Sequence, residues 1–109
     1  MNNNRLELLL QFYEEDPSDP FNAYALAMEY QNINVTKAFE YFTLLLDKHP
    51  DYLPTYYQAA TLFAEMGKNK YAEELYQKGM KLALYQQNTK TYQELQRAYR
   101  AFLDEKEEE

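Results

Sequence analysis

Few residues in this chain could carry out acid–base, nucleophilic or metal chemistry. His49 is the only histidine, Ser18 is the only serine, and there is no cysteine. A metal site or a catalytic triad combines several such groups, so a single histidine is a weak basis for either. His49 directly precedes Pro50, and a role in the turn at a helix end explains it better than a role as a ligand. The sequence therefore predicts neither a metal site nor a triad.

Two pairs of neighbouring carboxylates, Glu14-Glu15 and Glu73-Glu74, are the other candidates for acid–base catalysis. Adjacent residues of a helix do not face each other, so a solvated helix face is the better interpretation of both pairs. The sequence has no Gly-rich phosphate loop, no G-x-S-x-G elbow and no H-E-x-x-H motif. We expect no enzymatic activity and no cofactor; an enzyme whose site follows none of these patterns is kept as an alternative.

The charge balance limits the classes of partner. Eleven basic residues face 18 acidic ones, and the formal net charge is -7. Nucleic-acid binding depends on Lys and Arg displacing counterions, so we expect no nucleic-acid partner. No apolar run approaches the roughly 20 residues that a membrane span requires, and the N-terminus does not resemble a signal peptide. The absence of cysteine agrees with a cytoplasmic location, which we take as the expectation.

Apolar residues recur at helical spacing in six stretches separated by short polar segments. Asp19 and Pro20 favour a helix start, because Asp caps free amides and Pro suits the first turn. Pro50 and Gly67 mark helix ends. Short connections make neighbouring helices antiparallel. We predict an all-α fold with six helices and no sheet over residues 5–103. The six apolar stretches span residues 6–13, 23–30, 38–46, 56–63, 72–83 and 92–103.

Residue types recur between the predicted helices at a regular spacing. Ala38 and Ala72 lie about 34 residues apart, as do Pro20 and Pro54. A period of about 34 residues with two helices per unit is the signature of the tetratricopeptide repeat, and the chain resembles that family. The residues that carry the resemblance are Leu26, Ala27, Tyr30, Ala38, Phe42 and Pro50 in the first unit, and Tyr56, Ala60, Phe63, Gly67, Ala72, Tyr76 and Gly79 in the second.

Residue size at these positions has a physical reason. Alanines stand where two helices must approach closely, at positions 27, 38, 60 and 72. Large aromatic residues stand where the gap between hairpins must be filled, at positions 30, 42, 63 and 76. Leu84 occupies the place at which the family's pattern has Pro, so we expect the fifth helix to run on further than usual. One hairpin cannot bury its apolar face alone, whereas stacked hairpins can.

The resemblance implies a right-handed α–α superhelix of antiparallel helix pairs. We expect one domain over residues 1–109, with an N-terminal half-repeat at 4–15 and repeats at 20–50 and 53–86. A capping helix is expected at 89–105. The tail over residues 104–109 is acidic, and we expect it to fray because the helix macrodipole disfavours anions at a C-terminus.

The resemblance also implies a binding surface, because the first helix of each repeat lines a concave groove in similar proteins. Carried over, that face comprises Tyr24, Met28 and Gln31 in the first repeat, and Tyr57, Thr61 and Ala64 in the second. Each set follows i, i+4, i+7 along one side of a helix. Tyr and Met are adaptable contact residues. The alternative is that these residues pack against the first and last helices of so short a stack.

Two functions follow from this interpretation. The first is a scaffold or adaptor that binds a partner protein or peptide through the groove and is itself a monomer. The second is a structural module that self-associates through the ends of its solenoid. Members of the family that grip acidic peptide tails use Lys, Arg and Asn on the groove face, and the equivalent face here has no cation. We therefore expect a preference for apolar or aromatic segments.

Overall fold

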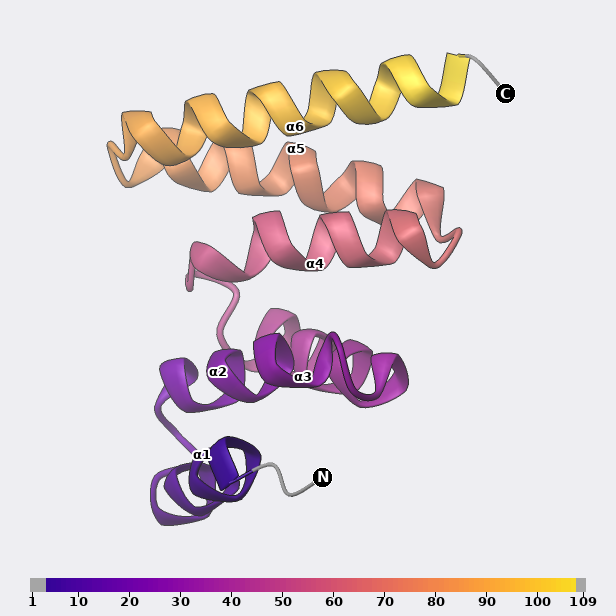
Figure 1. Ribbon diagram of the computed structural model, residues 1–109. Helices are drawn as coiled ribbons and strands as arrows, with labels where there is room; N and C mark the ends of the chain where they lie inside the picture. The colour runs from indigo at the N-terminus through magenta and orange to yellow at the C-terminus, as the bar shows by residue number, and fades with distance from the viewer. Residues whose placement is uncertain (1–3, 108–109) are drawn as a thin grey trace. The chain divides into compact units, whose positions relative to one another are not determined.

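The computed structural model describes residues 4–107. Over that range the regular secondary structure consists of α-helices joined by short turns, with no strand (Figure 1). The prediction of an all-α fold with six helices is confirmed over these residues. None of the described helices is both long enough and apolar enough to cross a membrane. The helices are α1 (Asn4–Glu15), α2 (Pro20–Tyr30), α3 (Val35–Lys48), α4 (Pro54–Glu65), α5 (Asn69–Tyr85) and α6 (Thr89–Glu107).

The chain forms two compact units. Unit 1 comprises residues 1–55, with α1, α2, α3 and the first residues of α4, and unit 2 comprises residues 56–109, with the rest of α4, α5 and α6. The helices α1 to α5 lie within the residue ranges 4–15, 20–50 and 53–86, and α6 continues two residues beyond the predicted capping helix at 89–105. The assignment of both units to a single domain, and the right-handed superhelix, stay predictions.

In unit 1 the start of α2 is fixed by capping. The side chain of Asp19 accepts a hydrogen bond from the backbone N–H of Phe21 at 3.0 Å, and Pro20 occupies the first turn. Asn22 Nδ2 donates to the carbonyl oxygens of Phe12, at 3.3 Å, and Asp16, at 3.0 Å, which ties α2 to the end of α1. The described residues that have no exposed surface in this unit are Leu26, Ala27, Ala38, Phe42, Leu45 and Thr55.

In unit 2 the small-residue prediction is confirmed. Ala60 and Ala72 have no exposed surface, and neither has the aromatic ring of Phe63. The ring of Phe63 lies 4.8 Å from that of Tyr71, so α4 and α5 pack closely at this level. Helix α6 contributes Leu95 and Phe102, whose side chains are also buried.

The turn from α4 to α5 depends on a glycine. Gly67 has a φ of +80°, a conformation that residues with a Cβ rarely adopt. In that turn the N–H of Lys68 donates to the carbonyl of Phe63 at 2.8 Å, which satisfies one of the free carbonyls at the helix end. Gly67 therefore ends α4, as its position in the sequence predicts.

The fifth helix is the longest of the first five, and it ends at Tyr85 through a turn that the sequence did not suggest. Gln87 adopts a φ of +59°, and the N–H of Asn88 donates to the carbonyl of Ala83 at 2.8 Å. The side chain of Asn88 then accepts from the N–H of Thr91 at 3.0 Å and caps α6. A glutamine therefore occupies a place that usually selects glycine.

Replacing Gln87 by Gly is expected to raise the free energy of unfolding by about 0.5–1 kcal/mol, because a left-handed φ is strained for residues with a Cβ. Urea unfolding followed by circular dichroism measures this. Gln93→Gly, in the interior of α6, is the control and should lower stability by about 1 kcal/mol. Equal destabilisation by both substitutions would contradict the assigned turn.

The C-terminal end of α6 continues to Glu107, beyond Asp104, where fraying was expected to begin. Lys106 lies in the last turn, and its ammonium group is 5.3 Å from the centroid of the Phe102 ring. A cation at this end interacts favourably with the helix macrodipole and offsets part of the repulsion among the glutamates. Fraying in solution stays a prediction, and residues 108–109 lie outside the described part of the chain.

Candidate functional site

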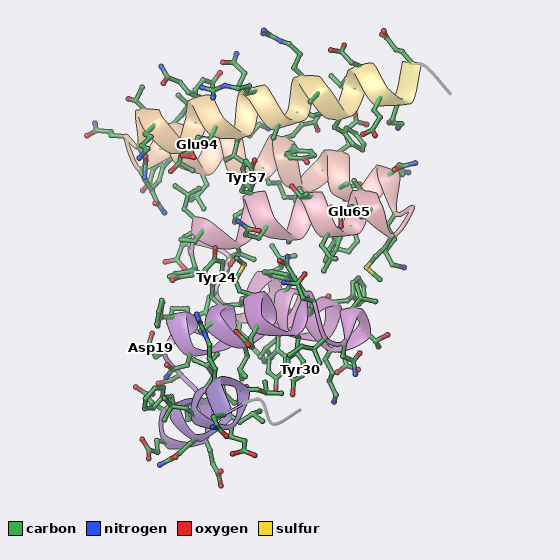
Figure 2. All side chains as sticks on the ribbon, in the orientation of Figure 1. Asp19, Tyr24, Tyr30, Tyr57, Glu65 and Glu94 are labelled. Atoms are coloured by element: carbon green, nitrogen blue, oxygen red, sulfur yellow. The ribbon has the colours of Figure 1, made fainter. Side chains whose placement is uncertain are left out.

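A pocket with a volume of about 440 Å³ opens on unit 2. Its walls come from α4, the start and middle of α5, and the second half of α6. Tyr57 and Glu65, which mark its wall on α4, are labelled in Figure 2. The lining residues are Tyr57, Thr61, Ala64, Glu65, Asn69, Tyr76, Ala98, Ala101, Phe102, Glu105 and Lys106.

Three of the six predicted groove residues lie together in this pocket. Tyr57, Thr61 and Ala64 all line it, and they are the residues spaced i, i+4, i+7 along α4. Tyr57 is 38% exposed, whereas Tyr56 beside it is buried in the core. This face of α4 is therefore open in unit 2, and α6 forms another wall of the pocket rather than covering it.

The buried hydroxyl of Tyr76 joins two helices below the pocket. Thr61 Oγ1 donates to the carbonyl of Tyr57 at 2.9 Å, so Tyr76 donates its own hydroxyl proton to Thr61 across 3.3 Å. Tyr76 is only 4% exposed, and this hydrogen bond compensates for the burial of its polar end. The bond holds the side chain of Thr61 in place at the floor of the pocket.

Aromatic contacts fix the wall that α6 contributes. The ring of Tyr76 lies 5.5 Å from that of Phe102 and 5.7 Å from that of Tyr99. Tyr99 donates its hydroxyl proton to Glu73 Oε2 at 3.0 Å and accepts from Gln77 Nε2 at 2.9 Å. Glu73 therefore has a structural role in joining α5 to α6, whereas Glu74 is exposed to solvent.

The charged residues at the pocket are two acids and one base. Glu65 comes from the end of α4, and Glu105 and Lys106 come from the last turns of α6. Burial raises the pKa of Tyr76, and the carboxylates of Glu65 and Glu105 raise it further. Thr61 lowers this pKa, because its hydroxyl can turn and donate to the phenolate once Tyr76 is ionised. Both carboxylates therefore act electrostatically on the floor of the pocket.

Alkaline pH is expected to destabilise the protein through its tyrosines. Burial is the largest cause of the raised pKa of Tyr76, and the same holds for Tyr24. A phenol whose folded pKa lies above its unfolded value of 10.0 contributes stability that is complete below pH 10 and is lost as pH rises through the folded pKa. The free energy of unfolding should therefore fall above about pH 10.

Urea unfolding across that range, with absorbance of the phenolate in parallel, measures this dependence. Tyr76→Phe is the matched control, because it keeps the ring and removes one titrating hydroxyl. The loss of stability at alkaline pH should be smaller in that variant. A stability that is constant up to about pH 11 in the native chain would contradict the burial of these hydroxyls.

The other three predicted groove residues belong to unit 1. Tyr24 is half-buried, and its ring makes edge contacts with Phe42, at 6.5 Å, and Tyr52, at 5.8 Å. It therefore takes part in the packing of unit 1. Met28 is partly exposed on α2. Gln31 is the C-cap residue directly after Tyr30, the last residue of α2, and its N–H donates to the carbonyl of Met28.

The wall formed by α6 was not predicted. Ala98, Ala101, Phe102 and Glu105 follow the spacing i, i+3, i+4, i+7, which places them on one face of the helix. The two alanines on that face were the available signal, because small residues leave room beside a neighbouring helix.

The residues first considered for catalysis lie apart in turns and on exposed faces. His49 caps the end of α3, where its N–H donates to the carbonyl of Leu45 at 2.7 Å. Ser18 donates its hydroxyl proton to Asp16 at 2.8 Å within the turn between α1 and α2. Across residues 4–107, no three His, Cys, Asp or Glu side chains are grouped so that they could hold a metal ion.

Comparison with known proteins gives the family. No protein-family model matches the chain, and no curated protein sequence matches it significantly. A solution structure of a tetratricopeptide repeat domain protein from Salinibacter ruber is 34% identical, with a TM-score of 0.74, and the match covers 80% of this chain and 89% of that one. A crystal structure of such a protein from the same organism is 33% identical, covering 77% and 96%, with a TM-score of 0.73. With its six helices and its repeated small and aromatic positions, this chain belongs to the tetratricopeptide repeat family.

Proposed function

We propose that this chain is a cytoplasmic, non-enzymatic adaptor or scaffold that binds a partner polypeptide as a monomer. The observation that carries the proposal is the pocket of unit 2, which is lined by the predicted contact residues Tyr57, Thr61 and Ala64. Tetratricopeptide repeat domains typically mediate protein–protein interactions, which supports the same class of function.

The pocket is large enough to receive a side chain of a partner polypeptide. Its volume of about 440 Å³ lies within the usual range of about 300–1,000 Å³ for ligand pockets. Tyr57, Tyr76 and Phe102 supply aromatic area, and aromatic residues are enriched where protein interfaces are most buried. The contacts of Tyr76 with Thr61 and Phe102 hold the floor in one arrangement before binding, which lowers the entropic cost of association.

The proposed contact residues of unit 1 are Tyr24, Met28 and Gln31. Met28 and Gln31 are partly exposed, and a methionine can adapt its shape to an apolar partner. Tyr24 offers only part of its ring, because Phe42 and Tyr52 cover the rest. We expect Met28→Ala to weaken partner binding less than Tyr57→Ala does.

Acidic C-terminal peptides are expected not to bind. Among residues 4–107, Lys106 is the only cation that lines the pocket, and it lies over Phe102 with Glu65 and Glu105 also at the pocket. A peptide carboxylate would lose hydration there without an adequate ion pair, and the net charge of -7 would repel it on approach. An acidic-tail peptide and an apolar peptide, both labelled, are titrated at low salt. Micromolar binding of the acidic peptide that is lost in Tyr57→Ala would contradict the proposal.

A second candidate function is self-association through the ends of the solenoid. The observation that favours it is the apolar surface of α1, where Leu8 and Phe12, four residues apart on one face of the helix, are both exposed. Exposed apolar patches of this kind often mark protein interfaces. Size-exclusion chromatography with light scattering distinguishes the two functions: a monomer at all concentrations favours the adaptor, and a dimer that Phe12→Glu dissociates favours self-association.

A further inference from the structure

The charges at the pocket of unit 2 indicate the chemistry of the group that it binds. Glu65 and Glu105 reach the same pocket from two different helices. Among the ion pairs formed within residues 4–107, neither carboxylate has a partner. Two like charges that share a pocket repel each other, and a cation between them would be attracted by both.

The aromatic walls of the pocket favour the same kind of ligand. Faces of aromatic rings attract cations whose centre lies within about 6 Å of the ring centroid. The chain's own Lys106 already makes such a contact, with its ammonium group 5.3 Å from the centre of Phe102. Tyr57 is exposed beside this wall, and its ring is free to stack on an incoming planar group.

We propose that the pocket receives an arginine side chain of the partner polypeptide, held between Glu65 and Glu105 and stacked against Tyr57. The inference rests on the proposed function and names the chemistry of the partner. A guanidinium is planar, so it stacks on an aromatic ring while its N–H groups donate to carboxylates on both sides. Lysine has no planar face and fits this arrangement less well.

The chain as a whole favours such a partner. Its net charge of -7 attracts a basic segment before contact and repels an acidic one. Lys106 has the opposite effect, because it occupies one aromatic face and partly neutralises the two carboxylates. A partner arginine must therefore displace Lys106 or bind beside it, and removing the lysine charge should strengthen binding.

A set of blocked tripeptides, acetyl-Leu-X-Leu-amide with X as Arg, Lys, Gln or Glu, tests the inference on the full chain. Titrations are followed through the backbone amide signals of the protein in nuclear magnetic resonance spectra. The Arg peptide should bind about tenfold more tightly than the Gln peptide, with Lys between them and Glu weakest. The largest shifts should occur at Tyr57, Thr61 and Ala101, and the preference for Arg should decrease as salt is added.

Three variants separate this pocket from the general charge of the protein. Glu65→Gln combined with Glu105→Gln should abolish the preference for Arg, so that the Arg and Gln peptides bind with about equal affinity. Lys106→Gln should strengthen binding of the Arg peptide about two- to threefold. The control combines Glu74→Gln with Glu94→Gln, which changes the net charge equally at exposed positions outside the pocket lining and should keep the preference. Glu94 lies toward the end of α6 away from Glu105 (Figure 2).

The outcomes distinguish the inference from the function on which it rests. If all four peptides shift the pocket signals with equal affinity, the pocket binds apolar groups only, so the arginine inference is wrong and the proposed function stands. If no peptide shifts Tyr57, Thr61 or Ala101, both are wrong. A preference for Arg that survives in the Glu65→Gln and Glu105→Gln variant would also overturn the inference.

Discussion

Replacing Ala72 by Glu is expected to unfold unit 2. Ala72 has no exposed surface and lies on α5 next to the level at which Phe63 and Tyr71 contact each other. A glutamate there would overpack the helix contact, which typically costs about 1–3 kcal/mol, and would add the larger penalty of an unpaired buried charge. Together these approach the total stability of a small domain, about 5–15 kcal/mol. Circular dichroism during urea and thermal unfolding measures the loss.

Ala64→Glu is the matched control, because it makes the same chemical change on the neighbouring helix. Ala64 lines the open pocket and is partly exposed, so a charged side chain there can reach water. We expect a change in stability of about 1 kcal/mol or less. If the two variants melted at the same temperature, the assignment of buried and open faces in unit 2 would be wrong.

Replacing Gly79 by Val is expected to lower the free energy of unfolding by about 3 kcal/mol. A Cβ atom at this position would lie 2.7 Å from the Cβ of Tyr56 and 3.1 Å from Leu95 Cδ1. Tyr56 cannot move away easily, because the clash involves its Cβ rather than the far end of its side chain and because the residue is buried. The valine methyl groups would add to this overpacking between α4, α5 and α6.

A series at the same position tests this packing. Gly79→Ala gains about 1 kcal/mol of helix propensity but still places a Cβ against Tyr56, so its stability should fall between those of the native chain and Gly79→Val. Gly67→Ala serves as a comparison, since no atom lies within 4 Å of its added Cβ and only the left-handed φ is strained. A Gly79→Ala variant more stable than the native chain would contradict the close approach.

The fold could be predicted from the sequence because its signals are local and repeat. Asp19 and Pro20 mark a helix start, and Gly67 marks a helix end, whatever the tertiary context. Alanines at repeat-related positions indicate which faces approach closely. The turn at Gln87 was not predictable in the same way, because a glutamine carries no local preference for a positive φ. It is held there by the contact of Asn88 with the end of α5.

The lining of the pocket in unit 2 could be predicted in part from the sequence. The spacing of Tyr57, Thr61 and Ala64 identified the open face of α4, since residues four and three positions apart share one side of a helix. The contribution of Phe102 and Glu105 depends on how α6 is rotated about its own axis, and that rotation is set by contacts such as those of Tyr76. No second copy of α6 exists in the chain, so the repeat gave no indication of its orientation.

A comparative pull-down from the native cells tests most directly whether the pocket of unit 2 is a partner-binding surface. The native chain, Ala64→Glu and the control Leu84→Glu are each used as bait, and the eluates are compared by quantitative mass spectrometry. Leu84 is exposed on α5 and does not line the pocket, so its variant makes a similar apolar-to-acidic change elsewhere. We expect at least one protein to be retained equally by the native chain and by Leu84→Glu and to be lost by Ala64→Glu. Equal recovery of every partner by a folded Ala64→Glu variant would contradict a binding role for the pocket.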